Sequence, residues 1–437
     1  MPKPTSKASP TVEWPLAVPQ SLEVWLDAHE FGPVMHLGRL HHESGVVRFE
    51  YDRAWLKTED AFQLDPELAL GAGSFYPESS NFGIFLDSSP DRWGQVLMKR
   101  REAVMARKFA GVARTLKTWD FFIGVQDLTR MGALRFSPLQ TVKGAIPNQP
   151  AFHPDACLAD ELLAAPAVTE LSKLQSIAKG LTDKKNIDDK LVEAWLKVLV
   201  APGASLGGAR PKANIRQTDG HLWIAKFAAA DDTHDWAARE KLVHQLACDY
   251  LLDTSPAELL RIGTGYHTFV TKRFDRVGNR RRFFTSAMSV LRHADREDAS
   301  YLELAQFISD NGVQDFIKKD LHELFKRLLF NVATGNRDDH LRNHGFIRHI
   351  GGWRLAPAFD MNPSIKKDEH VLTLDGSSTE PDLDLAMATA DCYQVTKRQA
   401  QQYRQELTQV MGKWKDMAKR FRLDSGDVAE LQGIFQG

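Results

Sequence analysis

The segment Thr334–His344, with the sequence TGNRDDHLRNH, constrains what this chain can fold into more than any other stretch. Within it Asp338 is followed five residues later by Asn343, which is the spacing of a phosphoryl-transfer loop. In such a loop the aspartate accepts a proton from a hydroxyl group, and the asparagine carbonyl oxygen binds Mg²⁺. Taken alone, these residues also fit a polar surface loop with a capping aspartate.

A second metal-binding carboxylate is expected downstream of this loop, and Asp360 in the segment LAPAFDMNPS is placed to supply it. Two apolar runs, 344–350 and 353–359, lie before it and are separated by a pair of glycines. This pattern predicts a short hairpin. We therefore expect the hairpin to return Asp360 to the side of Asp338, so that both carboxylates face one cleft.

Composition excludes several classes of protein. The 437 residues are 43% apolar, enough for two or three domains, and 56 Lys and Arg against 57 Asp and Glu give a net charge of −1. That balance gives no overall bias toward nucleic acid or acidic partners. The three cysteines lie far apart without metal-binding spacing, which indicates buried thiols in a reducing compartment. With no apolar run of about 18 residues and no signal-peptide core, we expect a cytoplasmic protein without a membrane span.

The order of strand-like and helix-like segments predicts an α+β fold in four parts. A nucleotide would bind between the last two of them. The parts are a flexible, proline-rich arm at 1–20, a β-rich subdomain at 21–150, a mixed strand and helix lobe at 151–275, and a helical lobe at 276–437.

Two helix starts can be predicted from capping residues. Ser89 is expected to cap a helix whose first turn contains Pro90. Near the end of the chain, Thr396 is expected to cap one long helix that continues to Phe421, with apolar residues at steps of three and four.

A glycine-rich segment, SLGGARPK at Ser205–Lys212, is a candidate phosphate-binding loop. Gly207 and Gly208 would let backbone amides approach phosphate oxygens because no Cβ stands in the way, and Lys212 could add a positive charge. Ser205 is a candidate phosphate acceptor. The segment matches neither the Walker A nor the GxGxxG pattern, and an ordinary turn is the alternative.

Lys226 lies inside an apolar strand-like run, LWIAKFA. A buried ammonium is costly unless it meets an anion, which would be a phosphate or a carboxylate. Glu240 on the following helix is the expected counter-charge, as in the lysine–glutamate pair of kinases. A lysine on an edge strand that extends its ammonium to water is the alternative.

The segment Val270–Arg276, VTKRFDR, is strand-like and ends in charged residues, which suits a linker between two lobes. Backbone groups near Lys272 and Phe274 could bind the edge of an adenine ring. The alternative is a strand end held by salt bridges.

A metal-dependent hydrolase is a different interpretation of the cluster formed by Asp338, His340 and Asn343. It would need further ligands, for which Asp339 and His344 are candidates. This interpretation leaves the glycine-rich segment and Lys226 unexplained.

In this order and spacing, the five elements resemble the HipA family of serine/threonine kinases, the toxin partners in HipA–HipB toxin–antitoxin modules. The resemblance covers nearly the whole chain and implies a bilobal, kinase-like fold with a β-rich N-terminal subdomain, a mixed N-lobe and an all-α C-lobe. Its motifs are FGIFLDSSPDRWG in the N-terminal subdomain, SLGGARPK as phosphate loop, KRFDR as hinge strand, GNRDDHLRN as catalytic loop and LAPAFD as metal-binding segment.

The resemblance implies ATP and Mg²⁺ as cofactors and assigns a role to each motif residue. Asp338 would be the catalytic base, Asn343 and Asp360 would bind Mg²⁺, and Glu240 would form the structural ion pair. Phosphorylation of Ser205 by the protein itself would drive the phosphate loop out of the site and inactivate the kinase. The residues expected to contact ATP are Gly207, Gly208, Ala209, Arg210, Pro211, Lys212, Lys226, Lys272, Arg273, Phe274, His340, Leu341, Arg342, Asn343, Phe359 and Asp360.

The resemblance also implies partners: a HipB-like helix-turn-helix antitoxin, operator DNA reached through the antitoxin complex, and a translation-related protein substrate carrying Ser or Thr. The chain departs from the family at two places. Asp339 and His340 follow the base where a small residue is common, and Arg210–Pro211 replaces a Gln-Glu-like pair. A kinase-shaped co-repressor that phosphorylates no other protein is the alternative function.

Overall fold

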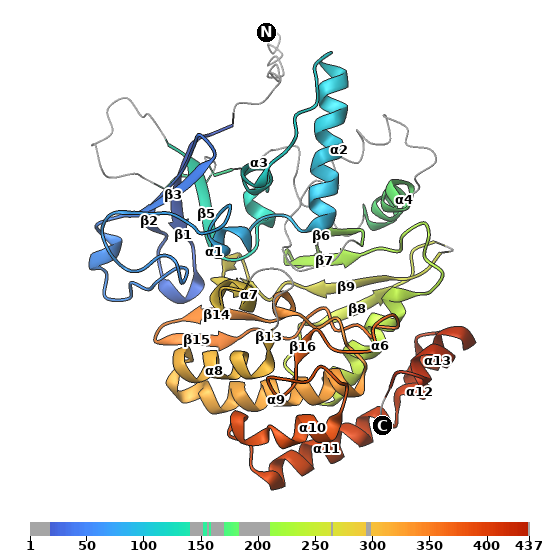
Figure 1. Ribbon diagram of the computed structural model, residues 1–437. Helices are drawn as coiled ribbons and strands as arrows, with labels where there is room; N and C mark the ends of the chain where they lie inside the picture. The colour runs from blue at the N-terminus through green and yellow to red at the C-terminus, as the bar shows by residue number, and fades with distance from the viewer. Residues whose placement is uncertain are drawn as a thin grey trace.

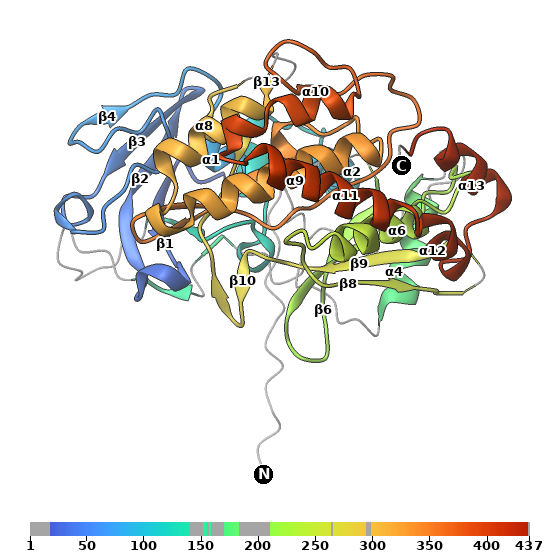
Figure 2. The same cartoon turned by 90° about the horizontal axis from the view of Figure 1, so that it is seen from below.

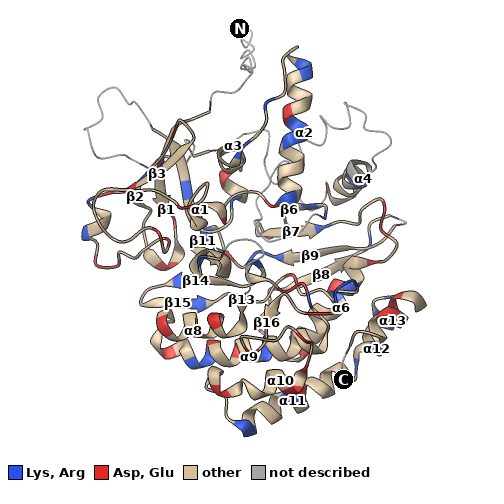
Figure 3. Ribbon diagram, viewed as in Figure 1, with Lys and Arg blue, Asp and Glu red and all other residues tan. Residues whose placement is uncertain are grey.

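The computed structural model describes residues 18–139, 152–154, 157–158, 170–182, 210–263, 265–293 and 299–435. Ser205, Gly207, Gly208 and Ala209 lie outside the described residues, as does most of the predicted N-terminal arm. Within the described ranges, none of the helices combines the length and the apolar character needed to span a bilayer. Basic and acidic residues are interspersed over the molecule (Figure 3), in keeping with the net charge of −1.

The N-terminal subdomain is built on an antiparallel sheet with the strand order β4-β3-β2-β1-β5. Strands β2 and β3 are joined by a two-residue hairpin turn: Ser44 and Gly45 both have positive φ, 52° and 85°, as such a turn between right-twisted strands requires. Phe49 and Phe136 of the sheet pack against Phe85 of the first helix, and all three side chains are fully buried. The strands are β1 (Ser21–Leu26), β2 (Met35–Glu43), β3 (Val46–Tyr51), β4 (Ser74–Phe75) and β5 (Leu134–Pro138), with helices α1 (Gly83–Leu86) and α3 (Thr118–Ile123).

Helix α2 (Arg92–Lys108) begins later than predicted. Its cap is Asp91, whose carboxylate accepts from the Gly94 N–H at 2.7 Å. The prediction of Ser89 as the cap was wrong, because the Ser89 hydroxyl donates to the carbonyl of Phe85 in the preceding turn. Trp93 and other apolar residues of α2 pack with α4 (Leu171–Thr182) and the neighbouring N-lobe sheet, so this helix joins the subdomain to the N-lobe (Figure 1).

The N-lobe contains an antiparallel sheet in the order β6-β7-β9-β8 and one long helix, α6. Strands β6 and β7 form a hairpin whose turn includes Gly220, at a φ of 83°. The elements are β6 (Lys212–Arg216), β7 (Leu222–Lys226), α6 (Trp236–Asp249), β8 (Ala257–Leu260) and β9 (Thr268–Lys272).

The C-lobe is mainly helical, which with the two sheets above confirms the bilobal α+β fold. The expectation that it is all-α was too simple. A sheet in the order β12-β14-β15 carries the predicted hairpin, with His349 opposite Gly352 at its end, because Phe346 and Ile347 pair with the strand that follows the hinge. The strands are β12 (Phe284–Ser286), β14 (Gly345–His349) and β15 (Gly352–Leu355), with the short pairs β10 (Arg276–Val277) and β11 (Arg280–Arg281), and β13 (Ala299–Ser300) and β16 (Leu372–Thr373).

Helices α8 and α9 cover this sheet, and the C-terminal helices wrap around them toward α6 (Figure 2). Thr396 caps α11 as predicted, by accepting from the Gln399 N–H at 3.3 Å. The predicted single helix is interrupted after Met411, where Gly412 weakens the helix and Trp414 turns into the core. The helices are α7 (Ala287–Val290), α8 (Tyr301–Asn311), α9 (Ile317–Ala333), α10 (Leu383–Ala388), α11 (Lys397–Met411), α12 (Trp414–Arg420) and α13 (Ser425–Gln432).

Hydrogen bonds from a buried ion-pair network attach the segment between the lobes to the N-terminal subdomain. Asp275 is fully buried and accepts from Arg273 at 2.7 Å, from Arg276, and from the Gly132 N–H at 2.8 Å. The Arg273 guanidinium also donates to the carbonyl of Thr129 at 2.6 Å. For the segment Val270–Arg276, both interpretations therefore hold: it connects the two lobes, and its end is held by salt bridges.

Candidate functional site

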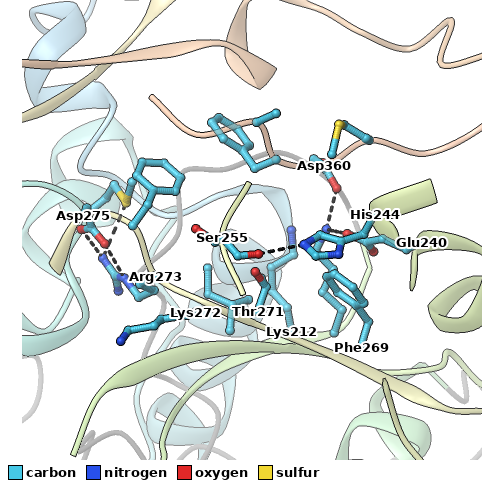
Figure 4. A pocket seen from close by; sticks show the side chains of 17 residues that line it. Lys212, Glu240, His244, Ser255, Phe269, Thr271, Lys272, Arg273, Asp275 and Asp360 are labelled. Atoms are coloured by element: carbon cyan, nitrogen blue, oxygen red, sulfur yellow. Dashed lines mark hydrogen bonds and ion pairs between the residues drawn. The ribbon is translucent and has the colours of Figure 1, made fainter. Parts of the chain in front are cut away.

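Two adjoining cavities lie between the N-lobe and the C-lobe. One, of about 710 Å³, has mostly apolar walls from β7, β9, the hinge and residues 358–361 (Figure 4). The other, of about 1090 Å³, has more polar walls. Four residues line both cavities, which therefore form one cleft: Lys212, Lys226, Glu240 and Asp360.

Lys226, at the end of β7, stands where the two cavities meet. Its ammonium donates to Glu240 Oε1 at 2.5 Å and to Asp360 Oδ1 at 2.6 Å, so the predicted lysine–glutamate pair is present. Burial acts to lower the pKa of Lys226, but the charges of Asp360 and Glu240 outweigh it and raise that pKa. The ammonium is therefore held charged between helix α6 of one lobe and the segment of the other lobe that carries Asp360.

The described end of the predicted phosphate loop lies beside Lys226. Lys212 is paired with Lys226 in the β6–β7 register, so both side chains lie on the same face of the sheet, and its ammonium meets Asp91 at 3.0 Å. Arg210 forms an ion pair with Asp232. Pro211 joins them, and its carbonyl accepts from the Phe227 N–H at 2.8 Å.

Asp338 lies in the loop that follows α9 and lines the polar cavity. Its side chain is 59% exposed and forms an ion pair with Lys367. Its backbone N–H donates to Ser364 Oγ at 2.9 Å. A carboxylate held at the backbone but open to solvent is accessible to an incoming hydroxyl group.

Asn343 completes this loop in the short helix Leu341–Asn343. Its Nδ2 donates to the carbonyl of Asp338 at 3.3 Å, which fixes the orientation of the amide. Its Oδ1 is buried and has no hydrogen-bond partner among the described residues. A buried carbonyl oxygen without a donor costs free energy unless a ligand or water satisfies it.

Asp360 follows the hairpin and faces the same cavity, as predicted. It has a φ of 57°, a left-handed conformation uncommon for a residue other than glycine and often found at functional sites. Burial acts to raise its pKa, but Lys226 and Lys212 lower the pKa overall, so the carboxylate is ionised.

The oxygen atoms of Asn343 and Asp360 suit Mg²⁺, which takes only part of its ligands from protein. They suit less well a metal ion whose ligands are all protein side chains. Mg²⁺ is commonly bound by one or two carboxylates, with waters and phosphate oxygens completing its coordination. Across the described ranges there is no group of three or more His, Cys, Asp or Glu that could hold a metal ion. The small oxygen set therefore matches a metal that arrives with a phosphate ligand.

Asp339 and His344, the extra ligands of the hydrolase interpretation, point into the C-lobe core. Asp339 accepts from His344 Nε2 at 2.7 Å, from Asn331 Nδ2 at 2.9 Å, and from the Tyr301 hydroxyl. Burial acts to raise the pKa of Asp339, but the charge and hydrogen bond of His344 lower it overall. These two residues therefore anchor the loop, and the structure does not bring them to the cleft as metal ligands.

The apolar cavity contains the residues predicted to surround an adenine ring. The Phe274 and Phe359 rings are stacked with centroids 5.4 Å apart, and both line it together with Lys272. Arg273 also lines it, but its guanidinium turns toward Asp275 (Figure 4), so its backbone is what remains for a ligand.

Other predicted contacts are placed differently. His340 lines the polar cavity, and its buried Nδ1 has no hydrogen-bond partner among the described residues. Leu341 packs in the C-lobe core, and neither it nor Arg342 lines the two cavities. Sequence reasoning gave these residues a shared role because they are contiguous, although successive side chains of a short helix point in different directions.

Sequence reasoning missed several residues of the cleft. His244 lies one helical turn after Glu240, so the helical period could have indicated it. Lys367 and Asp91, which pair with Asp338 and Lys212, left no signal because nothing in their local sequence indicates the long-range contact. Other missed wall residues of the apolar cavity are Met131, Ile224, Ser255, Phe269, Thr271, Asp275, Ala358 and Met361. Those of the polar cavity include Trp236, Asn336 and Ser364.

A mixed lobe and a mainly helical lobe, with a Lys–Glu pair and two facing loops between them, define a protein-kinase-like fold. Sequence models of two families match the chain: the HipA N-terminal domain over residues 22–136 and the HipA-like C-terminal domain over residues 204–416. The chain belongs to the HipA family.

Two solved structures illustrate the similarity. HipA from Shewanella oneidensis, in a complex with HipB and its operator DNA, is 16% identical and has a TM-score of 0.63, with 94% of each chain covered. The proinflammatory kinase CtkA from Helicobacter pylori is 12% identical and has a TM-score of 0.31, covering 48% of this chain and 94% of its own. A search of curated protein sequences gives no significant match.

Proposed function

We propose that the protein is an ATP- and Mg²⁺-dependent serine/threonine protein kinase. The observation that carries this proposal is the convergence of Lys226, Asp338, Asn343 and Asp360 on one polar cavity that continues into an apolar one. The apolar cavity suits an adenine ring, and the polar cavity suits a triphosphate. Incubation of the protein with labelled ATP and Mg²⁺ tests the proposal by transfer of the label.

In this proposal each group of the cleft has a chemical task. The Asp338 carboxylate accepts the proton of an incoming Ser or Thr hydroxyl, and its exposed ion pair with Lys367 is weak enough to yield to a substrate. Lys226 and Lys212 hold phosphate oxygens. Mg²⁺, when bound, neutralises the charge that develops on the phosphoryl oxygens, and Asn343 and Asp360 are the residues that would hold it.

Replacement of Asn343 with alanine is expected to raise the Mg²⁺ concentration needed for half-maximal phosphate transfer by about tenfold, because it removes one oxygen ligand. The measurement is a Mg²⁺ titration of phosphate transfer at saturating ATP. Asn311→Ala, at the exposed end of α8, is the control and should titrate as the unmodified protein does. An unchanged titration for Asn343→Ala would show that the metal binds elsewhere.

Phosphorylation of Ser205 is proposed to inactivate the kinase. A phosphate adds about −1.5 to −2 charges beside a segment suited to bind phosphate, so repulsion should displace that segment and weaken ATP binding. We expect Ser205→Asp to bind ATP about tenfold more weakly in calorimetric titrations, whereas Ser205→Ala binds normally. Normal binding by Ser205→Asp would contradict this mechanism.

We further propose that the protein is the toxin of a toxin–antitoxin pair and phosphorylates a translation-related protein. Family membership and the fold it shares with HipA of the HipA–HipB–operator complex support this. The expected partners are a HipB-like helix-turn-helix antitoxin and operator DNA bound through it. Growth arrest on expression that requires Asp338, and that is relieved by a small helix-turn-helix protein encoded next to it, is the corresponding test.

A further inference from the structure

The C-terminal helix α13 lies beside α6, far from it in sequence but next to it in the fold (Figure 2). Asp424 caps α13 by accepting from the Asp427 N–H at 2.8 Å, and Leu431 anchors it in the C-lobe core. From this position α13 contacts α6, which lines the cleft on the N-lobe side. The residues after α13 contact the loop that carries Asp338 on the C-lobe side.

The contact with the N-lobe wall is a buried ion pair. Arg239 on α6 is fully buried and donates through Nε to Asp427 Oδ1 at 2.7 Å and through Nη2 to Glu430 Oε2 at 2.7 Å. The Asp427 side chain is only 2% exposed, and His234 meets the same carboxylate at 3.0 Å. Because both main partners are buried, loss of the Asp427 charge would leave Arg239 paired with Glu430, whose side chain is 37% exposed, and would weaken the contact.

Arg239 is adjacent to Glu240, the partner of Lys226. The first turn of α6 thus presents Trp236 and Glu240 to the polar cavity and Arg239 to α13. The Trp236 ring also contacts two guanidinium groups, whose Cζ atoms lie 5.0 Å (Arg239) and 5.2 Å (Arg210) from the ring centroid. The position of this turn, and of the groups it presents to phosphate, therefore depends on α13.

The contact with the C-lobe wall is made by Ile434. Gly335, at the start of the loop that carries Asp338, has a φ of 62°, and a Cβ there would lie 2.0 Å from Ile434 Cγ2. The Gly335 carbonyl accepts from the Ser364 N–H at 2.8 Å, and Ser364 Oγ accepts from the Asp338 N–H at 2.9 Å. Ile434 therefore supports the loop that holds the proposed base.

We propose that α13 and Ile434 act as a clamp that positions the catalytic groups of both lobes, with Asp427 as a positioning residue that acts through Arg239 on Glu240. This inference rests on the proposed kinase function. The clamp keeps the Lys226–Glu240 pair and the Asp338 loop at a fixed separation. It makes the C-terminal segment part of the catalytic apparatus although it touches no substrate.

The kinetic test uses Asp427→Asn, which removes the charge and keeps the shape, with Asp416→Asn at an exposed position of α12 as the matched control. With labelled ATP, the maximal rate of autophosphorylation should fall about tenfold for Asp427→Asn, whereas the KM for ATP stays within about threefold. The control should match the unmodified protein. Unchanged maximal rates for Asp427→Asn would overturn the inference.

A second arm separates positioning from general destabilisation. In a Glu240→Gln background the target of the clamp is already lost, so adding Asp427→Asn should change the residual rate by less than about twofold. A full tenfold loss in that background would overturn the inference, because the two residues would then act independently. Ile434→Ala acts on the Asp338 loop instead of on Glu240, so it should still lower the rate in the Glu240→Gln background.

A third arm does not depend on activity. Amide hydrogen exchange in residues 236–243 of α6 should become about tenfold faster in Asp427→Asn, whereas exchange in the β1–β2 hairpin stays unchanged. Unchanged exchange in α6 would overturn the clamp. Absence of phosphate transfer by the unmodified protein would instead overturn the proposed function, and the exchange arm would still decide the structural claim.

Discussion

Replacement of Asp338 with alanine should lower phosphate transfer by about 10²–10⁴-fold, the range expected when a positioned general base is removed. The loss should appear in the maximal rate, because the side chain would act on the hydroxyl substrate and does not line the apolar cavity. The side chain is 59% exposed, so folding should be unaffected. The measurement is incorporation of label from ATP, with thermal unfolding as a check of integrity.

Asp368→Ala, an exposed carboxylate in the next loop, is the control and should label as the unmodified protein does. Equal labelling by Asp338→Ala would rule out the proposed catalytic role. If the unmodified protein binds ATP and never transfers phosphate, the kinase-shaped co-repressor becomes the better account.

The largest effect on stability is expected for Asp275→Asn. This change leaves Arg273 and Arg276 buried without their counter-charge, and removing one partner of a buried pair costs about 3–5 kcal/mol. Thermal unfolding should show a transition at clearly lower temperature, and the detached hinge should weaken ATP binding as well. Asp310→Asn, at an exposed position of α8, is the control. A transition temperature equal to that of the unmodified protein would show that the network contributes little.

The same network should resist acid. Burial acts to raise the pKa of Asp275, but Arg273 and Arg276 lower it far below its ordinary value. The stability that this ion pair contributes is therefore fully present above the ordinary aspartate pKa of about 3.9 and is lost progressively as the pH falls from there through the lower pKa of the folded state.

Much of the cleft could be predicted because its motifs are local. Each of three motifs can be recognised from a few neighbouring residues. They are the spacing of Asp338 and Asn343, the hairpin before Asp360 and the strand around Lys226. The Lys226–Glu240 contact followed because an apolar strand with a lysine needs an anion and the next helix offers one.

Other features depend on contacts that local sequence does not reveal. Asp338 and Asp339 are adjacent and chemically identical, and only burial beside His344 decides which of them anchors the loop. Arg273 was expected at the nucleotide, but its guanidinium meets an aspartate two residues on and carbonyls from the N-terminal subdomain. The Arg239–Asp427 pair joins distant parts of the chain, so no spacing could indicate it.

The central claim is that groups from both lobes hold one magnesium nucleotide. The most direct measurement is a crystal structure with Mg²⁺ and a non-hydrolysable ATP analogue. We expect Mg²⁺ about 2.0–2.1 Å from Asn343 Oδ1 and from an Asp360 oxygen, with a phosphate near Lys226 and the adenine ring in the cavity lined by Phe274 and Phe359. A nucleotide bound outside this cleft, or a metal that contacts neither Asn343 nor Asp360, would contradict the account.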